Sequence, residues 1–128
     1  MGASITNKRT ILIVDDEHDV IETLGFMLKK RGYSVTTAFD SREVLEKAKS
    51  KKPDLIVLDL MMPYIDGFEV CKKIKNDEEL KKIPVIALTA RSDDSARMKA
   101  QNSGVDDYIL KPFSLTFLIG KINGFFYV

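Results

Sequence analysis

Short apolar runs alternate with amphipathic stretches along the chain, and this alternation predicts its secondary structure. Residues 11–14, 55–58 and 85–88 are continuous apolar runs with β-branched side chains, which are typical of strands buried on both faces. Residues 33–38 and 108–110 are weaker candidates with a more edge-like character. The pattern therefore predicts five strands.

Five helices are predicted between and after these strands. Gly32 suits a left-handed end of the first helix, residues 40–43 resemble a capping box, and Ser114 suits the cap of the fifth helix. The apolar positions of the five helices are Val20, Leu24, Met27 and Leu28; Val44, Leu45 and Ala48; Phe68, Cys71 and Ile74; Ala96 and Ala100; Leu115, Leu118, Ile119 and Ile122. Strands that alternate with helices predict an α/β fold, a parallel sheet in a three-layer sandwich.

Composition narrows the class of protein. The chain has 128 residues, 45% of them hydrophobic and 30% charged, which suits one globular domain, and no linker divides it. Its 20 basic and 19 acidic residues give a net charge of +1, so we expect no direct nucleic-acid or membrane partner. Cys71 is the only cysteine and is expected in the core. With no signal-peptide pattern and no apolar run of ~20 residues, a cytoplasmic protein is expected.

Polar residues stand where the predicted strands end, at the edge where open α/β sheets bind ligands. These residues are Asp15, Asp16 and Glu17 after the first strand, Asp59 after the third, Thr89 after the fourth, and Lys111 and Pro112 after the fifth. Two carboxylates ~4 Å apart repel by roughly 4 kcal/mol at an effective dielectric of about 20, so the cluster needs a cation, and a hard ion such as Mg²⁺ fits. A carboxylate nucleophile, a metal, a lysine and a hydroxyl are the parts of a phosphoryl-transfer site.

Five motifs in order resemble the receiver domain of response regulators in two-component signalling. They are ILIVDDE at 11–17, DLIVLDLMMP at 54–63, DG at 66–67, LTA at 88–90 and GVDDYILKPF at 104–113. The resemblance implies a receiver domain at residues 10–128 after an N-terminal extension at residues 1–9. It also implies a flavodoxin-like, doubly wound sheet of five parallel strands in the order 2-1-3-4-5 with five helices.

The resemblance implies a phospho-acceptor and a metal site. Asp59 matches the residue that takes a phosphoryl group from a phosphohistidine on a sensor histidine kinase or a histidine phosphotransfer protein. Asp16 matches a direct Mg²⁺ ligand and Asp15 its companion, often acting through water, and Met61 matches the residue whose backbone carbonyl joins the metal. Mn²⁺ is expected to substitute for Mg²⁺.

Three further matches concern the phosphoryl group and the response to it. Thr89 matches the hydroxyl and Lys111 the amine that bind phosphoryl oxygens, and the peptide bond before Pro112 is expected to be cis. Tyr108 matches an aromatic switch that turns inward when Thr89 moves. The switch would remodel the face formed by the fourth and fifth predicted helices and the fifth predicted strand, which a downstream protein or a second receiver would bind.

The resemblance also implies that the residues at Met61 and Arg91 influence how long the phosphoryl group lasts, because in receiver domains these positions affect attack by water on the acyl phosphate. These residues lie two positions after Asp59 and Thr89, respectively. Neither side chain is an acid or an amide that could orient a hydrolytic water. Slow self-dephosphorylation is therefore predicted, and the domain is expected to be a switch that catalyses only its own phosphorylation and dephosphorylation, rather than an enzyme.

Each site residue also has an ordinary structural explanation. Asp15 and Asp16 could cap a helix, Thr89 could be one more β-branched strand end, Lys111 a solvated amine, and Tyr108 a static aromatic ring. Because these residues are all expected at the same edge of the sheet, a functional site is favoured over these separate structural explanations. His18 lies in the same acidic loop but is expected to be an exposed helix residue rather than a metal ligand.

Three rival functions share parts of this pattern. A phosphatase or phosphotransferase of the haloacid-dehalogenase type needs a second aspartate where Met61 stands, and a flavodoxin-like electron carrier needs a phosphate-binding loop after the first strand. A degenerate receiver that binds proteins without phosphorylation remains the main alternative.

The carboxyl terminus departs most from the usual receiver pattern. Gly120 and Gly124 weaken the last predicted helix, and residues 125–128 are apolar. Two explanations remain open. The rings pack against the domain or a second copy, or the chain is a fragment of a longer protein.

Overall fold

Five parallel strands form one sheet in the order β2-β1-β3-β4-β5 in the computed structural model, which describes residues 8–63 and 66–127. The strands are β1 (Thr10–Val14), β2 (Ser34–Ala38), β3 (Leu55–Asp59), β4 (Val85–Thr89) and β5 (Asp107–Leu110). The central strands β3 and β4 are buried throughout, whereas the edge strands β2 and β5 are partly accessible. The expected topology is confirmed. Residues 1–7 of the expected extension and Val128 lie outside the described residues.

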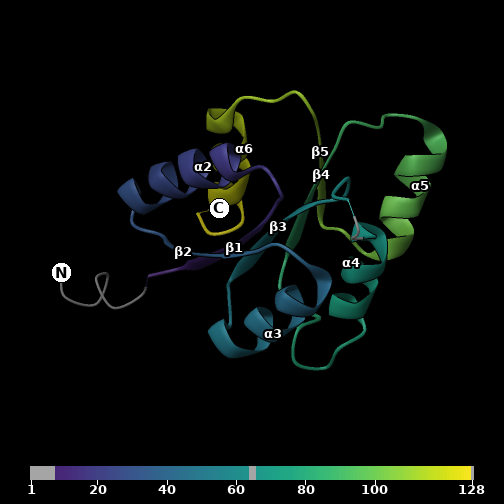
Figure 1. The fold of residues 1–128 in the computed structure, drawn as a ribbon, viewed down its shortest axis with the longest axis horizontal. Helices are drawn as coiled ribbons and strands as arrows, with labels where there is room; N and C mark the ends of the chain where they lie inside the picture. The colour runs from purple at the N-terminus through teal and green to yellow at the C-terminus, as the bar shows by residue number, and fades with distance from the viewer. Residues whose placement is uncertain (1–7, 64–65, 128) are drawn as a thin grey trace.

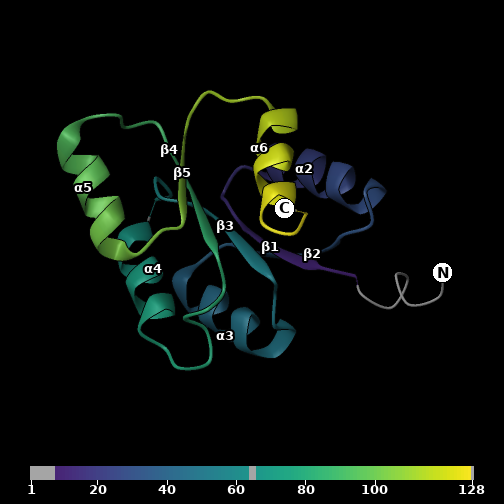
Figure 2. The same ribbon diagram turned by 180° about the vertical axis from the view of Figure 1, so that it is seen from behind.

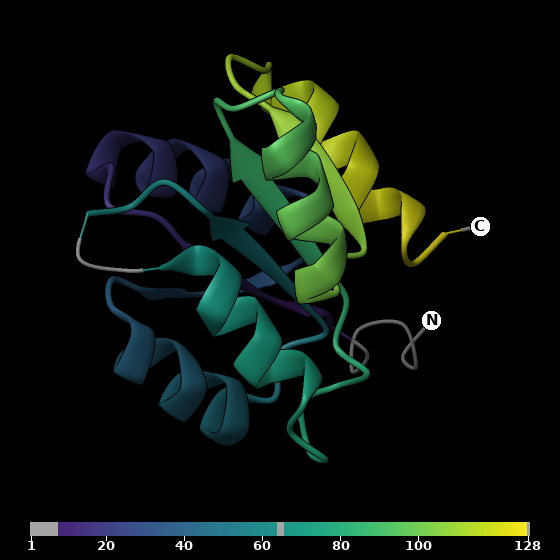
Figure 3. The ribbon, with the colours of Figure 1, turned by 90° about the vertical axis from the view of Figure 1, so that its right-hand side faces the viewer.

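Helices cover both faces of this sheet and make the predicted three-layer sandwich. They are α2 (His18–Lys30), α3 (Ser41–Lys51), α4 (Gly67–Lys75), α5 (Asp94–Ser103) and α6 (Leu115–Gly124). Helices α2 and α6 lie over one face, and α3, α4 and α5 lie over the other (Figure 1, Figure 2). Helices α4 and α5 run side by side in front of the sheet in Figure 3. Among the described helices, none is long and apolar enough to cross a membrane.

The helix ends follow from local sequence. Gly32, at φ +93, ends α2 with the left-handed conformation that glycine adopts without strain. The Asp40 carboxylate accepts a hydrogen bond from the Glu43 amide (2.8 Å) and caps α3. The Glu43 carboxylate accepts from the Phe39 amide, one residue before the position that a capping box uses. Ser114 caps α6 as predicted, by accepting from the Phe117 amide.

Alternate residues of each strand enter two separate cores because successive side chains point to opposite faces. Leu12 and Ile56 pack under α3, α4 and α5, whereas Ile11 and Leu55 pack under α2 and α6. Cys71 lies in the first core, fully buried as predicted, and burial raises the pKa of its thiol to about 11.

The segment after α6 folds back onto the second core. Phe125 and Phe126 pack against the cluster under α2 and α6. The Arg9 guanidinium lies 4.8 Å from the centre of the Phe126 ring, and the Tyr33 hydroxyl donates to the Asn123 side chain. These two rings therefore pack against the domain itself, which is one of the two explanations that the sequence left open.

Candidate functional site

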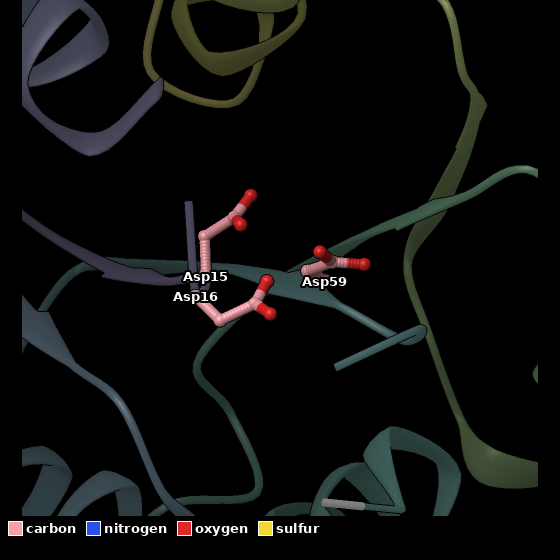
Figure 4. Close-up of side chains that lie close together, drawn as sticks. All are labelled: Asp15, Asp16 and Asp59. Atoms are coloured by element: carbon pink, nitrogen blue, oxygen red, sulfur yellow. The ribbon is translucent and has the colours of Figure 1, made fainter. Parts of the chain in front are cut away.

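Three carboxylates gather at the carboxyl edge of the sheet. Asp15 and Asp16 follow β1, and Asp59 ends β3, which is paired directly with β1 (Figure 4). One oxygen from each residue lies within 4.8 Å of the others. Asp15 and Asp59 are only 1% and 2% exposed, whereas Asp16 is exposed to solvent. The strand order thus brings Asp59 next to Asp15 and Asp16, although Asp59 lies 43 or more positions away from them in the sequence.

One carboxylate oxygen of Asp15 is buried and has no hydrogen-bond partner among residues 8–63 and 66–127. Its Oδ1 accepts a hydrogen bond from the Glu17 amide (2.9 Å), but its Oδ2 has no hydrogen-bond donor within the described residues. Burial, opposed by the Glu17 hydrogen bond and reinforced by the charge of Asp59, raises the pKa of Asp15 to about 6. A buried, unpaired carboxylate oxygen is costly, and a cation would remove that cost.

Lys111 supplies the positive charge of the site. Its Nζ lies 3.0 Å from Oδ2 of Asp59 and 3.7 Å from Oε1 of Glu17. Burial alone would lower the pKa of Lys111, but the hydrogen bond to Asp59 and the charges of Asp59, Asp15 and Glu17 raise it above its usual value. The peptide bond between Lys111 and Pro112 is cis. Lys111 therefore remains an ammonium beside the acidic cluster.

Asp59 is held by both of its oxygens. Oδ2 accepts from Lys111, and Oδ1 accepts from the backbone amide of Met61 (2.9 Å). Met61 itself, two residues after Asp59, is 47% exposed. These contacts fix the Asp59 carboxylate in one orientation at the end of β3.

Thr89 and Tyr108 meet through the backbone of Arg91. Thr89 is buried at the end of β4, and its Oγ1 accepts from the Arg91 amide (3.1 Å). The half-buried Tyr108 of β5 donates its hydroxyl hydrogen to the Arg91 carbonyl. The Thr89 hydroxyl retains its own proton, which is free to be donated to a ligand.

The donor set fits a hard divalent cation. Three carboxylates, one with an orphaned oxygen, match the oxygen ligands that Mg²⁺ prefers. His18 is not part of this cluster; its ring packs against the Phe39 ring in a tilted arrangement, with centroids 5.2 Å apart. This position agrees with the expected exposed helix residue.

A cavity of about 650 Å³ opens beside the cluster, between the beginning of α2 and the loop that joins β5 to α6. Asp15, Glu17 and Lys111 are among its charged lining residues. Val20, Phe113 and Leu115 are among its apolar lining residues. A ligand or partner group in this cavity would therefore contact both apolar side chains and the charged groups of the site.

The sequence analysis assigned no role to two residues that the structure brings into the site. Glu17 forms an ion pair with Lys111, and Gly67 packs against the backbone of Leu60, the residue after Asp59. Glu17 directly follows Asp15 and Asp16, and this run of three acidic residues could have indicated that Glu17 also lies in the site. Nothing in the local sequence indicates the close approach at Gly67.

Comparison with known proteins identifies the family. The family model for the response regulator receiver domain matches residues 11–123. The chain belongs to this family. Receiver domains are signalling modules of two-component systems rather than enzymes, and they interact with histidine kinases or phosphotransfer proteins. The resemblance seen in the five sequence motifs is thereby confirmed.

Relatives of this receiver domain occur in longer proteins. The alkaline phosphatase synthesis transcriptional regulatory protein PhoP of Bacillus subtilis is 44% identical over 108 residues, which cover 84% of this chain and 44% of PhoP. Hybrid signal transduction histidine kinase D of Dictyostelium discoideum is 40% identical over 119 residues, which cover 93% of this chain and 8% of the kinase. The chain therefore spans less than half the length of these curated relatives.

Solved structures confirm the fold of the receiver domain. The chemotaxis response regulator CheY4 of Vibrio cholerae superposes with a TM-score of 0.85 at 29% identity, covering 92% of this chain and 98% of CheY4. The receiver domain of DrrB activated with BeF₃ gives a TM-score of 0.80 at 30% identity, covering 92% of this chain and 97% of that domain. Both superpose on nearly the whole of the described fold.

Proposed function

We propose that residues 10–128, after an extension at residues 1–9, accept a phosphoryl group on Asp59 and act as a Mg²⁺-dependent switch. One observation carries the proposal. The buried Asp59 carboxylate lies within 4.8 Å of the Asp15 and Asp16 carboxylates and 3.0 Å from the Lys111 ammonium. This arrangement combines a nucleophile, a cation site and a fixed positive charge.

The proposed donor is a phosphohistidine on a sensor histidine kinase or a histidine phosphotransfer protein. An Asp59 oxygen attacks the phosphorus, and the phosphorus–nitrogen bond to the imidazole breaks, leaving its electron pair on the nitrogen. Lys111 moves from the carboxylate to a phosphoryl oxygen, and Thr89 donates its hydroxyl proton to another. The cavity beside Asp15 and Lys111 gives the donor an approach to this side of the site.

The carboxylates of Asp15, Asp16 and Asp59, with the backbone carbonyl of Met61, would hold the metal. Bound Mg²⁺, or Mn²⁺ in its place, supplies positive charge that offsets the phosphoryl oxygens. The orphaned Oδ2 of Asp15 supports this assignment, since no described donor satisfies it.

The proposed output is a change in the face formed by α5, β5 and α6, which contain the fourth and fifth helices of the sequence prediction. Thr89 and Tyr108 share Arg91 as a hydrogen-bond partner, so a change at the Thr89 hydroxyl, when a phosphoryl oxygen accepts its proton, is passed through the Arg91 backbone to the contact of Tyr108. Phosphorylation thereby shifts an existing equilibrium. The exposed apolar side chains of this face, which a downstream protein or a second receiver would cover, are Met98, Leu110 and Phe117.

Incubation with a small acyl phosphate and Mg²⁺, followed by intact mass measurement, tests the proposal. The expected result is a gain of one phosphoryl group that is lost in Asp59→Asn and after addition of a chelator. The matched control is Asp94→Asn, because Asp94 is an exposed aspartate in the first turn of α5 and is not part of the cluster of Asp15, Asp16 and Asp59. No mass gain in folded protein would favour the degenerate receiver, a binding module that works without phosphorylation.

A further inference from the structure

Arg91, in the loop between β4 and α5, joins the two residues of the proposed switch. Its amide donates to Thr89 Oγ1 (3.1 Å), and its carbonyl accepts from the Tyr108 hydroxyl. The conformation of one residue therefore fixes hydrogen bonds to both Thr89 and Tyr108. A group that holds Arg91 in this conformation therefore also maintains its hydrogen bonds to Thr89 and Tyr108.

Asp93 orders Arg91 from two residues away. Its Oδ2 accepts from Arg91 Nε (3.2 Å), and its Oδ1 accepts from Arg91 Nη2 (3.1 Å), which is the bidentate geometry that favours an arginine–carboxylate pair. The guanidinium holds the pKa of the Asp93 carboxyl below its usual value. Asp93 Oδ1 also accepts from the Ala96 amide (2.9 Å) and caps α5.

We infer that Asp93 is a positioning residue for phosphoryl binding, acting through Arg91 to present the Thr89 hydroxyl as a donor. This inference rests on the proposed function. The Arg91 guanidinium is paired with Asp93, so its role here is to hold the loop. Asp93 thus connects the first turn of α5 to the hydroxyl at the end of β4.

The physical basis is the limited number of hydrogen bonds that one hydroxyl group can make. Thr89 Oγ1 has one proton and two acceptor positions, and the Arg91 amide occupies one of those positions. The proton then remains available to an oxygen on the Asp59 phosphoryl group. When the loop is already ordered, binding does not have to immobilise it, so the affinity for a phosphoryl group is higher.

Titration of the full chain with beryllofluoride in the presence of Mg²⁺ tests this inference. Asp93→Asn removes the charge but keeps the cap of α5, because asparagine caps helices about as well as aspartate. We expect Asp93→Asn and Arg91→Ala each to weaken beryllofluoride binding by about twofold to fivefold, the range of a partly exposed ion pair. The double variant is expected to bind no more weakly than either single variant, because both changes remove the same pair.

A spectroscopic measurement separates positioning from a general loss of stability. In the Asp93→Asn protein without beryllofluoride, the NMR signals of the Thr89 methyl group and the Tyr108 ring are expected to shift. Glu78→Gln is the matched control; it breaks the exposed Lys81–Glu78 pair (3.0 Å), which lies between α4 and β4, and should change neither signal nor binding. Unchanged binding in Asp93→Asn, or effects that add in the double variant, would overturn the inference. Failure of the unmodified protein to bind beryllofluoride would instead overturn the proposed function.

Discussion

Lys111 Nζ lies 3.0 Å from Asp59 Oδ2, although the two residues are 52 positions apart in the sequence. The contact joins the end of β5 to the end of β3, across the end of β4. It places a positive charge on a carboxylate that is only 2% exposed. The pair therefore provides both a nucleophile and the charge that would receive a phosphoryl oxygen.

Substitution of Lys111 with methionine removes this charge while keeping a long side chain. We expect phosphorylation by a small acyl phosphate to slow by roughly 10-fold to 100-fold, the range for loss of a hydrogen bond to a charged group. Intact mass measured over time gives the rate. Lys81→Met, at an exposed lysine between α4 and β4, should leave the rate unchanged. Equal rates in the two variants would contradict the role of Lys111.

Asp15→Asn is expected to stabilise the metal-free protein at neutral pH. Burial raises the pKa of Asp15 from 3.8 to about 6, so folding favours the protonated form. The metal-free protein should therefore gain stability as the pH falls from about 6 toward 3.8, and lose it as the pH rises through about 6. Asparagine removes this penalty, which is on the order of 3 kcal/mol at pH 7.

Unfolding by urea in the presence of a chelator measures this effect of Asp15→Asn. Added Mg²⁺ should stabilise the natural sequence and have little effect on the variant, because a ligand of the metal has been lost. Asp94→Asn, at an exposed position in the first turn of α5, is the control, and added Mg²⁺ should stabilise it as much as it stabilises the natural sequence. Equal stabilisation by Mg²⁺ in the Asp15 variant would exclude Asp15 from the metal site.

Gly67→Ala is expected to disturb the site through the backbone. A Cβ at Gly67 would lie 2.7 Å from Cα of Leu60 and 3.3 Å from the carbonyl oxygen of Asp59. The segment that carries the phospho-acceptor must shift to relieve the first contact. We expect a loss of about 1–3 kcal/mol in the free energy of unfolding, as for other overpacked sites, together with slower phosphorylation.

Gly120→Ala provides the matched control for this substitution. A Cβ at Gly120 in α6 has no neighbour within 4 Å, so alanine should stabilise the helix by up to about 1 kcal/mol and leave phosphorylation unchanged. Denaturant unfolding and intact mass measure both effects. If Gly67→Ala proved as stable and as active as the natural sequence, the close approach to Leu60 would not constrain the site.

Met61→Asn is expected to shorten the lifetime of phosphorylated Asp59 several-fold. Met61 lies two residues after Asp59 and is 47% exposed, and its thioether side chain cannot orient a water molecule for attack on the phosphorus. An asparagine amide at this position can do so. Decay of the phosphorylated mass after removal of the donor gives the lifetime, and Met98→Asn, at an exposed methionine on α5, should leave it unchanged. If the lifetime were unchanged in Met61→Asn, Met61 would not be the reason for slow self-dephosphorylation.

Much of the fold and the main residues of the site were predictable from the sequence. Apolar periodicity is local, so the continuous runs at 11–14 and 55–58 identified central strands. Parallel strands all end at the same edge of a sheet, so Asp15, Asp59 and Lys111 were expected together once the strands were known. The strand order, the cis bond before Pro112 and the individual roles of the site residues required the resemblance to receiver domains, since local patterns determine neither which strands are neighbours nor what each residue does.

The tertiary structure alone decided how these residues contact one another. The sequence does not indicate that Arg91 pairs with Asp93, that Lys111 reaches both Asp59 and Glu17, or that Gly67 packs on Leu60. These contacts depend on loop conformations and side-chain directions that are set by packing between distant segments. The residue types and their positions at strand ends are thus a property of the sequence, whereas their partners and the unsatisfied oxygen of Asp15 are a property of the folded chain.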